Sequence, residues 1–270
     1  MMLSTDTFTH SSIALVFGGR SPIALACALE LAKRQNVILF TRKIDDELKK
    51  LVSSAADSIK LVEVDLSAKG GAYTFVNEIY KSGGEVNSVV FLQRYRPVGE
   101  ASFEDHAWVE LWCIEEIIKQ ISFQKSAGTK VNILISSSPA AAKAVLDQGS
   151  SYHVVKAGQE ALVRFLAAKH HSDALYINSI RIGSVVLKQR ASKYWASIPN
   201  VVKGLIGFSP SGYLQTSEDV GKSFAQLVTN GLGGATGQVI TLDDGFELRD
   251  GIQMAKLALE YGCNNDCLPF

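Results

Sequence analysis

Cysteine is scarce in this chain, with four residues among 270. So few cysteines in this length do not suggest a disulfide framework of the kind that small secreted domains use. Two of them, Cys263 and Cys267, lie in the segment CNNDC near the C-terminus. Their spacing is not a usual zinc pattern, so we expect no metal site.

Long apolar runs and an excess of one charge are also absent. No run reaches the ~18 apolar residues of a membrane-spanning helix. The opening segment MMLSTDTFTHSS lacks the basic and then apolar layout of a signal peptide, so we expect a cytoplasmic protein. Basic and acidic residues both number 27, a balance that gives no sign of a nucleic-acid or acidic-membrane partner.

What is present is the composition of a globular protein, with 47% hydrophobic and 20% charged residues. No internal repeat and no linker divides the sequence. We therefore expect one domain over residues 1–270, with residues 1–11 flexible.

Short β-rich runs alternate with helical patterns. Strands are predicted at 13–17, 37–41, 59–65, 87–93, 130–136, 175–182 and 237–245, and helices at 22–35, 44–55, about 70–82, about 104–124, from 150 onward, and 217–230. Residues 187–215 are predicted to be an irregular loop or lid on the substrate side. Continuous apolar strands between helices predict a Rossmann-type, doubly wound parallel sheet in a three-layer α/β/α architecture.

Ligands in such sheets bind at the carboxyl ends of the strands. The first of these ends is the turn FGGRSPIA, where Gly18 and Gly19 permit a tight turn and a close approach to a phosphate. Ser21 suits a helix N-cap and Pro22 suits the first helical position. A phosphate-binding turn and an ordinary strand-to-helix turn both fit this segment.

The end of the second strand bears on the choice of cofactor. A carboxylate there would bind the adenosine ribose of NAD, but the residues are Thr41 and Arg42. Arg42, with Arg20 from the glycine turn, suits a 2′-phosphate, so NADP(H) is preferred over NAD(H), unless both arginines are solvated surface residues. Asp65 ends the third strand. Its carboxylate could accept a hydrogen bond from the adenine amino group, or it could be the N-cap of the next helix.

Tyr152 and Lys156 stand four residues apart and therefore share one face of a helix. A nearby ammonium stabilises a phenolate and lowers the tyrosine pKa from its reference of about 10, which suits proton exchange with a carbonyl oxygen. Ser138, or else Ser137, can stabilise the same oxygen. The alternative is two polar residues on an ordinary amphipathic helix.

Together these segments resemble the short-chain dehydrogenase/reductase family over nearly the whole chain. The matching pieces are the glycine turn, VD after the third strand, VNILISSS, YHVVKAGQEALVRFLA, INSIRIG and TGQVITLDDG. The resemblance implies an oxidoreductase that uses NAD or NADP, acts on a carbonyl or alcohol compound and forms a homodimer or homotetramer.

The resemblance also implies roles for individual residues. Tyr152 would be the acid/base, Lys156 would lower its pKa and bind the nicotinamide ribose, and Ser138 would orient the carbonyl group. The cofactor-binding residues expected on this basis and from the turns above are Gly18, Arg20, Ser21, Ile23, Arg42, Asp65, Leu66, Tyr152, Lys156, Gly183 and Val185.

Several positions depart from the family pattern. Pro22 and Ala24 replace glycines, FLQRYR replaces an N-A-G type motif, and Ile182 replaces a proline. The family's helix asparagine has no counterpart in VELWC, where Glu110 or Cys113 faces its place. These departures motivate a second hypothesis, beside the preferred enzyme, of a catalytically impaired or non-catalytic dinucleotide-binding or scaffolding protein. A third retains the site for epimerisation or dehydration.

Two surfaces bear on partners. Basic residues in the 187–215 segment, with Arg94 and Arg96 after the fourth strand, indicate either an anionic substrate or a solvated lid. The apolar helix 107–121 is a candidate oligomer interface or a deeply buried helix of the monomer.

Overall fold

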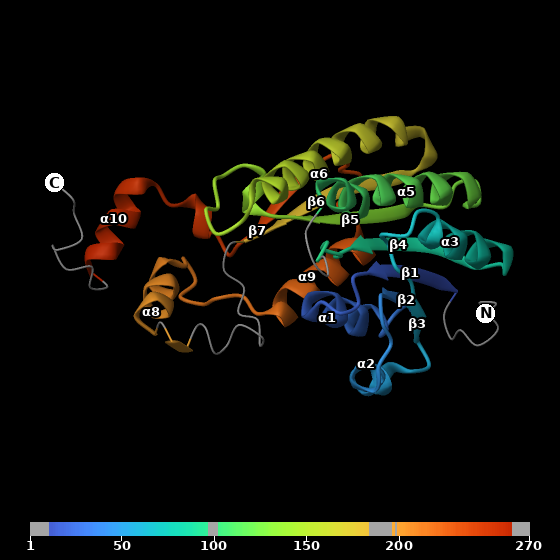
Figure 1. Ribbon diagram of the computed structural model, residues 1–270, viewed down its shortest axis with the longest axis horizontal. Coiled ribbons are helices and arrows are strands. Elements are labelled where there is room, and N and C mark those ends of the chain that lie inside the picture. Colours follow the sequence, from blue (N-terminus) through green and yellow to red (C-terminus); the bar gives the residue numbers. More distant parts are fainter. Residues whose placement is uncertain (1–10, 97–101, 184–195, 198, 261–270) are drawn as a thin grey trace.

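The computed structural model describes residues 11–96, 102–183, 196–197 and 199–260. Its centre is a seven-stranded parallel sheet in the order β3-β2-β1-β4-β5-β6-β7, which confirms the predicted fold class (Figure 1). The strands are β1 (Ser12–Phe17), β2 (Asn36–Thr41), β3 (Ile59–Glu63), β4 (Glu85–Phe91), β5 (Val131–Ser137), β6 (Leu175–Ile182) and β7 (Val239–Leu242). The order reverses between β1 and β4, so their carboxyl ends border a natural ligand crevice.

Helices cover both faces of the sheet (Figure 1). The longer helical segments are α1 (Pro22–Leu31), α2 (Asp46–Val52), α3 (Gly71–Lys81), α4 (Phe103–Ala107), the π-helical turn η2 (Trp108–Trp112), α5 (Cys113–Gln124), α6 (Ser150–Lys169), α8 (Pro199–Phe208), α9 (Ser217–Asn230) and α10 (Gly251–Glu260). Short 3₁₀ turns are η1 (Ser53–Ala55), η3 (Pro139–Ala141), η4 (His171–Asp173) and η6 (Phe246–Leu248). Helices α1 and α9 pack on one face, whereas α3, α5 and α6 pack on the other.

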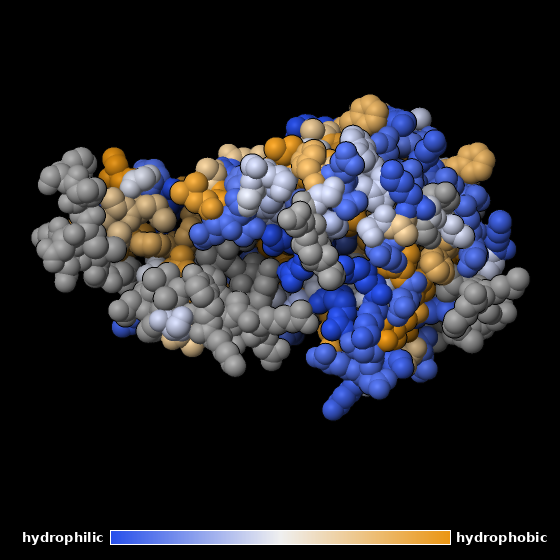
Figure 2. Space-filling view, viewed as in Figure 1, coloured by the Kyte–Doolittle hydropathy of each residue, from blue (hydrophilic) through white to orange (hydrophobic). Residues whose placement is uncertain are grey.

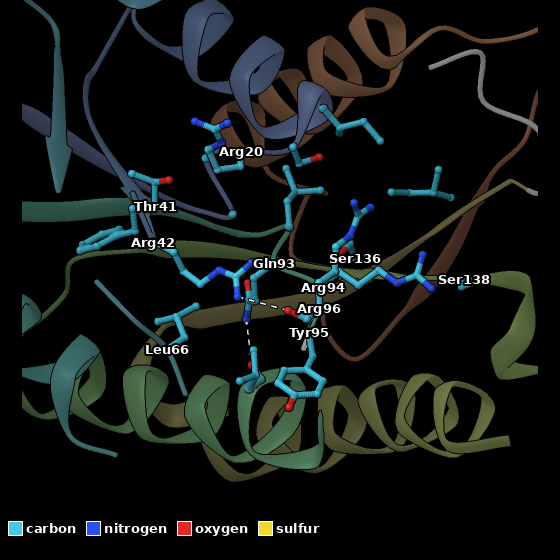
Figure 3. A pocket seen from close by; sticks show the side chains of 18 of the residues that line it. Arg20, Thr41, Arg42, Leu66, Gln93, Arg94, Tyr95, Arg96, Ser136 and Ser138 are labelled. Carbon is cyan, nitrogen blue, oxygen red and sulfur yellow. Dashed lines mark hydrogen bonds between the residues drawn. The ribbon is translucent and has the colours of Figure 1, made fainter. Parts of the chain in front are cut away.

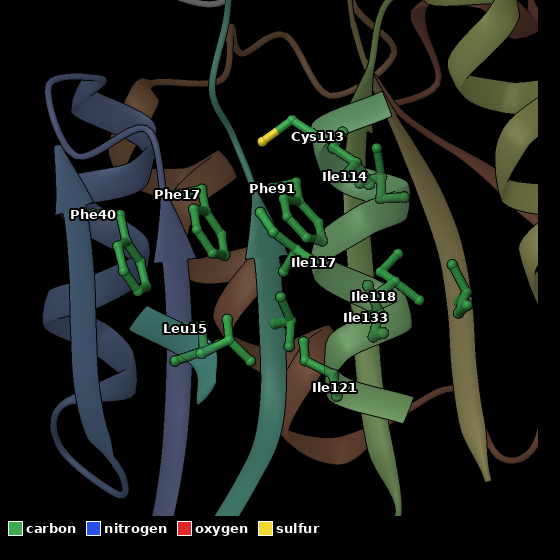
Figure 4. Close-up of a cluster of buried hydrophobic side chains, with 14 of the residues drawn as sticks. Leu15, Phe17, Phe40, Phe91, Cys113, Ile114, Ile117, Ile118, Ile121 and Ile133 are labelled. Atoms are coloured by element: carbon green, nitrogen blue, oxygen red, sulfur yellow. The ribbon is translucent and has the colours of Figure 1, made fainter. Parts of the chain in front are cut away.

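The core follows from the alternation of side chains along each strand. Leu15 and Phe17 of β1 face α3 and α5, whereas Ala14 and Val16 face α1 and α9. The Phe17 ring stacks on those of Phe40 and Phe91, with centroid distances of 4.4 and 4.9 Å (Figure 4). This aromatic row spans β2, β1 and β4 directly beneath the crevice and holds the three strand ends in register.

The C-terminal part departs from the prediction. Residues 199–208 lie within the segment predicted as irregular, yet they form α8, with Pro199 as its first residue. The last carbonyl groups of α8, those of Gly207 and Phe208, accept hydrogen bonds from Arg249 at 3.1 and 3.0 Å. The helix is therefore completed by a residue about forty positions away, which local patterns do not reveal. Helix α10 was not predicted at all.

The candidate interface helix is mostly buried within its own chain. Ile114, Ile117 and Ile118 are fully buried against the sheet, while Trp112 is half-exposed. The structure therefore favours the monomer-core alternative for most of this helix, and the oligomeric state remains a prediction. Within the described ranges, no helix has the length and apolar content to cross a bilayer. The cytoplasmic location likewise remains a prediction.

Candidate functional site

A cavity of about 1010 Å³ opens at the carboxyl ends of β1, β2, β4 and β5. Its wall carries the predicted residues Gly18, Arg20, Ser21, Ile23, Arg42, Asp65, Leu66, Ser138, Tyr152, Lys156 and Gly183. The structure thus brings together every described member of the predicted site, and Val185 lies outside the described residues. Figure 3 shows several of these side chains along the cavity wall.

The glycine turn is pressed against two neighbouring strand ends. Gly18 has a φ of +98°, and a Cβ atom there would lie 2.7 Å from the backbone of Leu92 and Gln93. The amides of Gly18 and Gly19 both donate to the Phe40 carbonyl, at 3.2 and 2.9 Å. Glycine at position 18 is therefore required by the close approach of the two chain segments and by the left-handed backbone.

Helix α1 begins directly after this turn and points its N-terminus at the cavity. Ser21 has the extended backbone of an N-cap, but its side chain makes no capping hydrogen bond. Pro22, at the first helical position, supplies no N–H group, so the remaining first-turn amides and the Ser21 hydroxyl are the donors at this end. These groups fit a bound phosphate, because a helix N-terminus favours negative charge.

The two arginines expected at the adenosine side have protein partners. Arg42 donates to the Arg96 carbonyl at 3.2 Å (Figure 3), and Arg20 forms an ion pair with Asp45. The Leu48 amide and the Arg20 guanidinium hold the pKa of Asp45 below its usual range. Figure 2 shows strongly hydrophilic residues gathered between the α5–α6 layer and the α1–α2 layer.

Asp65 does not cap the following helix, which overturns that alternative. Its carboxylate accepts from the Ser67 amide and hydroxyl, at 2.9 and 2.7 Å. Helix α3 begins later, with Gly70 as its N-cap. The carboxylate therefore closes a local turn at the cavity wall.

The two serine candidates separate clearly. Ser137 is buried, and its hydroxyl donates to Glu160 at 2.8 Å, a carboxylate also bound by Arg181 at 2.8 and 3.0 Å. Ser138 is half-buried at the cavity, where its oxygen accepts from the Ala140 amide at 3.3 Å. Because this bond uses only the oxygen, the Ser138 hydroxyl proton can be donated into the cavity.

Tyr152 and Lys156 lie one turn apart on α6, with the Lys156 ammonium 5.5 Å from the centre of the Tyr152 ring. The lysine is buried and already has two acceptors. Its Nζ donates to Glu110 at 2.7 Å and to Gln159 at 2.9 Å. An ammonium carries more N–H donors than these two bonds use, so Lys156 retains donor capacity toward the cavity.

Glu110, rather than Cys113, faces Lys156. Its carboxylate is fully buried in the π-helical turn and also accepts from the Tyr95 amide at 2.7 Å, with His106 Nε2 at 3.1 Å. Burial favours the neutral acid, but the Lys156 charge and the hydrogen bonds outweigh it and lower the pKa of Glu110 to about 2. Cys113 packs in the core instead.

Arg94 is close to the predicted acid/base, which the sequence did not reveal. Its guanidinium carbon lies 4.4 Å from the centre of the Tyr152 ring, and its NH2 group donates to Gln148 at 2.7 Å. Gln148 had no sequence signal, because it lies in a loop and its partner is 54 positions away. The site therefore combines a phenol, a serine hydroxyl and two cations.

The family follows from this arrangement together with sequence comparison. The model of the enoyl-(acyl carrier protein) reductase family matches residues 18–247, which span the glycine turn and the tyrosine helix. The chain belongs to the short-chain dehydrogenase/reductase family. This match confirms the predicted family. It also confirms the prediction of an oxidoreductase, because that is the activity of the family.

Curated relatives match the chain to different extents. The hydroxynaphthalene reductase-like protein Arp2 of Metarhizium anisopliae is 26% identical over 266 residues, covering 86% of this chain and 94% of the relative. The enoyl-acyl-carrier-protein reductase (NADH) FabI of a Nostoc species is 33% identical over 95 residues. That alignment covers 35% of this chain and 36% of FabI.

Solved structures share the fold. A 3-oxoacyl-acyl-carrier-protein reductase of Brucella melitensis, in complex with NAD, has a TM-score of 0.73 at 21% identity, covering 89% of this chain and 99% of that one. The RhlG protein of Pseudomonas aeruginosa, in complex with NADP, has a TM-score of 0.71 at 22% identity and covers 89% and 98%. At such identities the likeness shows the architecture alone.

Proposed function

We propose that this protein is an NADP(H)-dependent oxidoreductase that interconverts a carbonyl compound and an alcohol. The observation that carries the proposal is the shared cavity, whose wall contains the glycine turn at one end and Ser138, Tyr152 and Lys156 at the other. The cofactor supplies the hydride. The protein binds the cofactor, orients the substrate and exchanges a proton with it.

The proposed proton chemistry uses residues of this chain. The Tyr152 hydroxyl gives its proton to the carbonyl oxygen of the substrate and takes one back in the reverse direction. The Ser138 hydroxyl donates a hydrogen bond to the same oxygen and stabilises its developing charge. Lys156 stabilises the phenolate and binds the nicotinamide ribose, while Glu110 fixes the lysine in place.

The preference for NADP(H) is supported by the charges at the adenosine side. Arg20 and Arg42 both lie on the cavity wall, and Thr41 ends β2 where a carboxylate would select NAD. Asp65, an acidic wall residue, follows β3 rather than β2 and accepts from Ser67 through one carboxylate oxygen. Some relatives are named with NAD or NADH and others with NADP, so their names do not decide between the cofactors. The proposed preference therefore rests on the residues above.

The test is calorimetric titration with NADPH and NADH, followed by NADPH oxidation with a panel of aldehydes, ketones and oxo acids. We expect tighter binding of NADPH and turnover with at least one carbonyl class. If neither NADPH nor NADH binds, the proposed function is contradicted.

A second candidate is a dinucleotide-binding protein without turnover. It is favoured by the two protein acceptors on Lys156 and by Arg94 on the Tyr152 ring. Cofactor binding without NADPH oxidation across the whole panel would support this candidate, whereas turnover that depends on Tyr152 would exclude it.

A further inference from the structure

We propose that Arg94 binds an anionic group of the substrate and selects oxo acids, carbonyl compounds that also carry a carboxylate. The inference rests on the proposed function and names its substrate class.

Two contacts orient the exposed Arg94 guanidinium beside Tyr152. It lies against the Tyr152 ring, 4.4 Å from its centre, as cation–π contacts require. The bond to Gln148, at 2.7 Å, fixes it from the opposite loop. Arg94 comes from the segment after β4 and Gln148 from the segment before α6, so the pair bridges the cavity wall beside Tyr152.

The charge of Arg94 is not balanced by a carboxylate among the described residues. On the cavity wall, Lys156 is paired with Glu110 and Arg20 with Asp45, whereas Arg42, like Arg94, binds a neutral acceptor. For Arg94, the acceptor found in the described part of the chain is the neutral Gln148 amide. A guanidinium has more N–H donors than this bond uses, and their fork geometry matches a carboxylate.

A carboxylate on Arg94 and a carbonyl group at the Tyr152 hydroxyl would belong to one small molecule, because the guanidinium rests on the ring that carries the hydroxyl. In reduction a bound cofactor would supply the hydride to the carbonyl carbon, and the carbonyl oxygen would take the Tyr152 proton, which solvent would then replace. The carboxylate forms and breaks no bond. It provides orientation through charge-assisted hydrogen bonds.

The first arm of the test compares acids with their neutral amides: 2-oxobutanoate with 2-oxobutanamide, 3-oxobutanoate with 3-oxobutanamide, and 4-oxopentanoate with 4-oxopentanamide. Wild-type protein is expected to show a kcat/KM about 10- to 100-fold higher for the acid of the best pair, as charge-assisted hydrogen bonds allow. R94Q is expected to abolish this ratio.

The matched control is R164Q, which removes one exposed arginine charge from α6, away from the cavity wall. It should keep the acid-to-amide ratio. Q148L removes the side-chain acceptor that orients Arg94 and should reduce the ratio less than R94Q does. An R94Q enzyme that keeps the preference, or a wild-type enzyme that prefers the amide, overturns the proposal.

The second arm needs no turnover. Butanoate and butanamide are titrated by ligand-observed NMR into wild-type protein and R94Q, each with NADP⁺ present. We expect butanoate to bind wild-type protein only. If butanoate binds but no carbonyl compound is turned over, the proposed function fails and the anion site stands. If wild-type protein does not bind butanoate, the anion site fails, whatever the turnover.

Discussion

Two ion pairs, one at each end of the cavity, differ in how far water reaches them. At the end proposed to bind adenosine, here called the adenosine end, Arg20 and Asp45 form an ion pair whose side chains are 40% and 30% exposed. At the end proposed for catalysis, Lys156 and Glu110 form a pair whose side chains are 4% and 0% exposed. Water can replace either partner of an exposed pair, but nothing replaces a partner lost from a buried one. On the proposed function, Arg20 would exchange Asp45 for a cofactor phosphate, whereas Lys156 would stay paired with Glu110.

The largest effect on stability is expected at the buried pair. E110L leaves the Lys156 ammonium buried without a counter-charge, so we expect it to lower the free energy of unfolding by about 3–5 kcal/mol. Urea denaturation measures this loss. The control is E104Q, which changes an exposed glutamate six positions earlier. The double variant E110L/K156M should recover much of the loss. If E110L and E104Q behave alike, the buried pair does not stabilise the fold.

Acid should weaken the same end of the cavity. The pKa of Glu110 is lowered from 4.5 to about 2, so its contribution is complete above pH 4.5 and is lost as the pH falls toward 2. The loss amounts to about 3 kcal/mol for a shift of this size. We expect the stability difference between wild-type protein and E110Q to shrink over this range. A difference that stays constant from pH 5 to pH 2.5 contradicts the assignment.

At the adenosine end, cofactor selectivity should change while stability does not. R42Q removes the guanidinium proposed to bind the 2′-phosphate, so we expect about 10-fold weaker NADPH binding and unchanged NADH binding. Calorimetry measures both constants. R34Q, an exposed change beyond the end of α1, is the control. Equal losses for NADPH and NADH would show that Arg42 does not read the phosphate.

The smallest effect is expected at the exposed pair. D45N retains a capping oxygen for the Leu48 amide and removes the charge that occupies Arg20. We expect an almost unchanged thermal midpoint and a slightly tighter NADPH complex. Weaker NADPH binding in D45N would contradict the exchange of Asp45 for a phosphate.

The sheet and the principal site residues could be predicted because their signals are local. Apolar runs mark the strands, and the spacing of Tyr152 and Lys156 places both on one helical face. The charge balance around them could not be predicted. Glu110 and Lys156 are 46 positions apart, and a π-helical turn decides that Glu110 faces the lysine while Cys113 faces the core. Likewise, the bond between Arg94 and Gln148 joins two loops.

The proton-transfer role of Tyr152 is the central claim, and one rate comparison tests it most directly. Wild-type protein and Y152F are compared at saturating NADPH with the best carbonyl compound of the panel. We predict equal NADPH affinity and a kcat lowered by about 10²- to 10⁴-fold in Y152F, because only the proton donor is lost. A Y152F enzyme that binds NADPH and keeps the wild-type kcat contradicts the account.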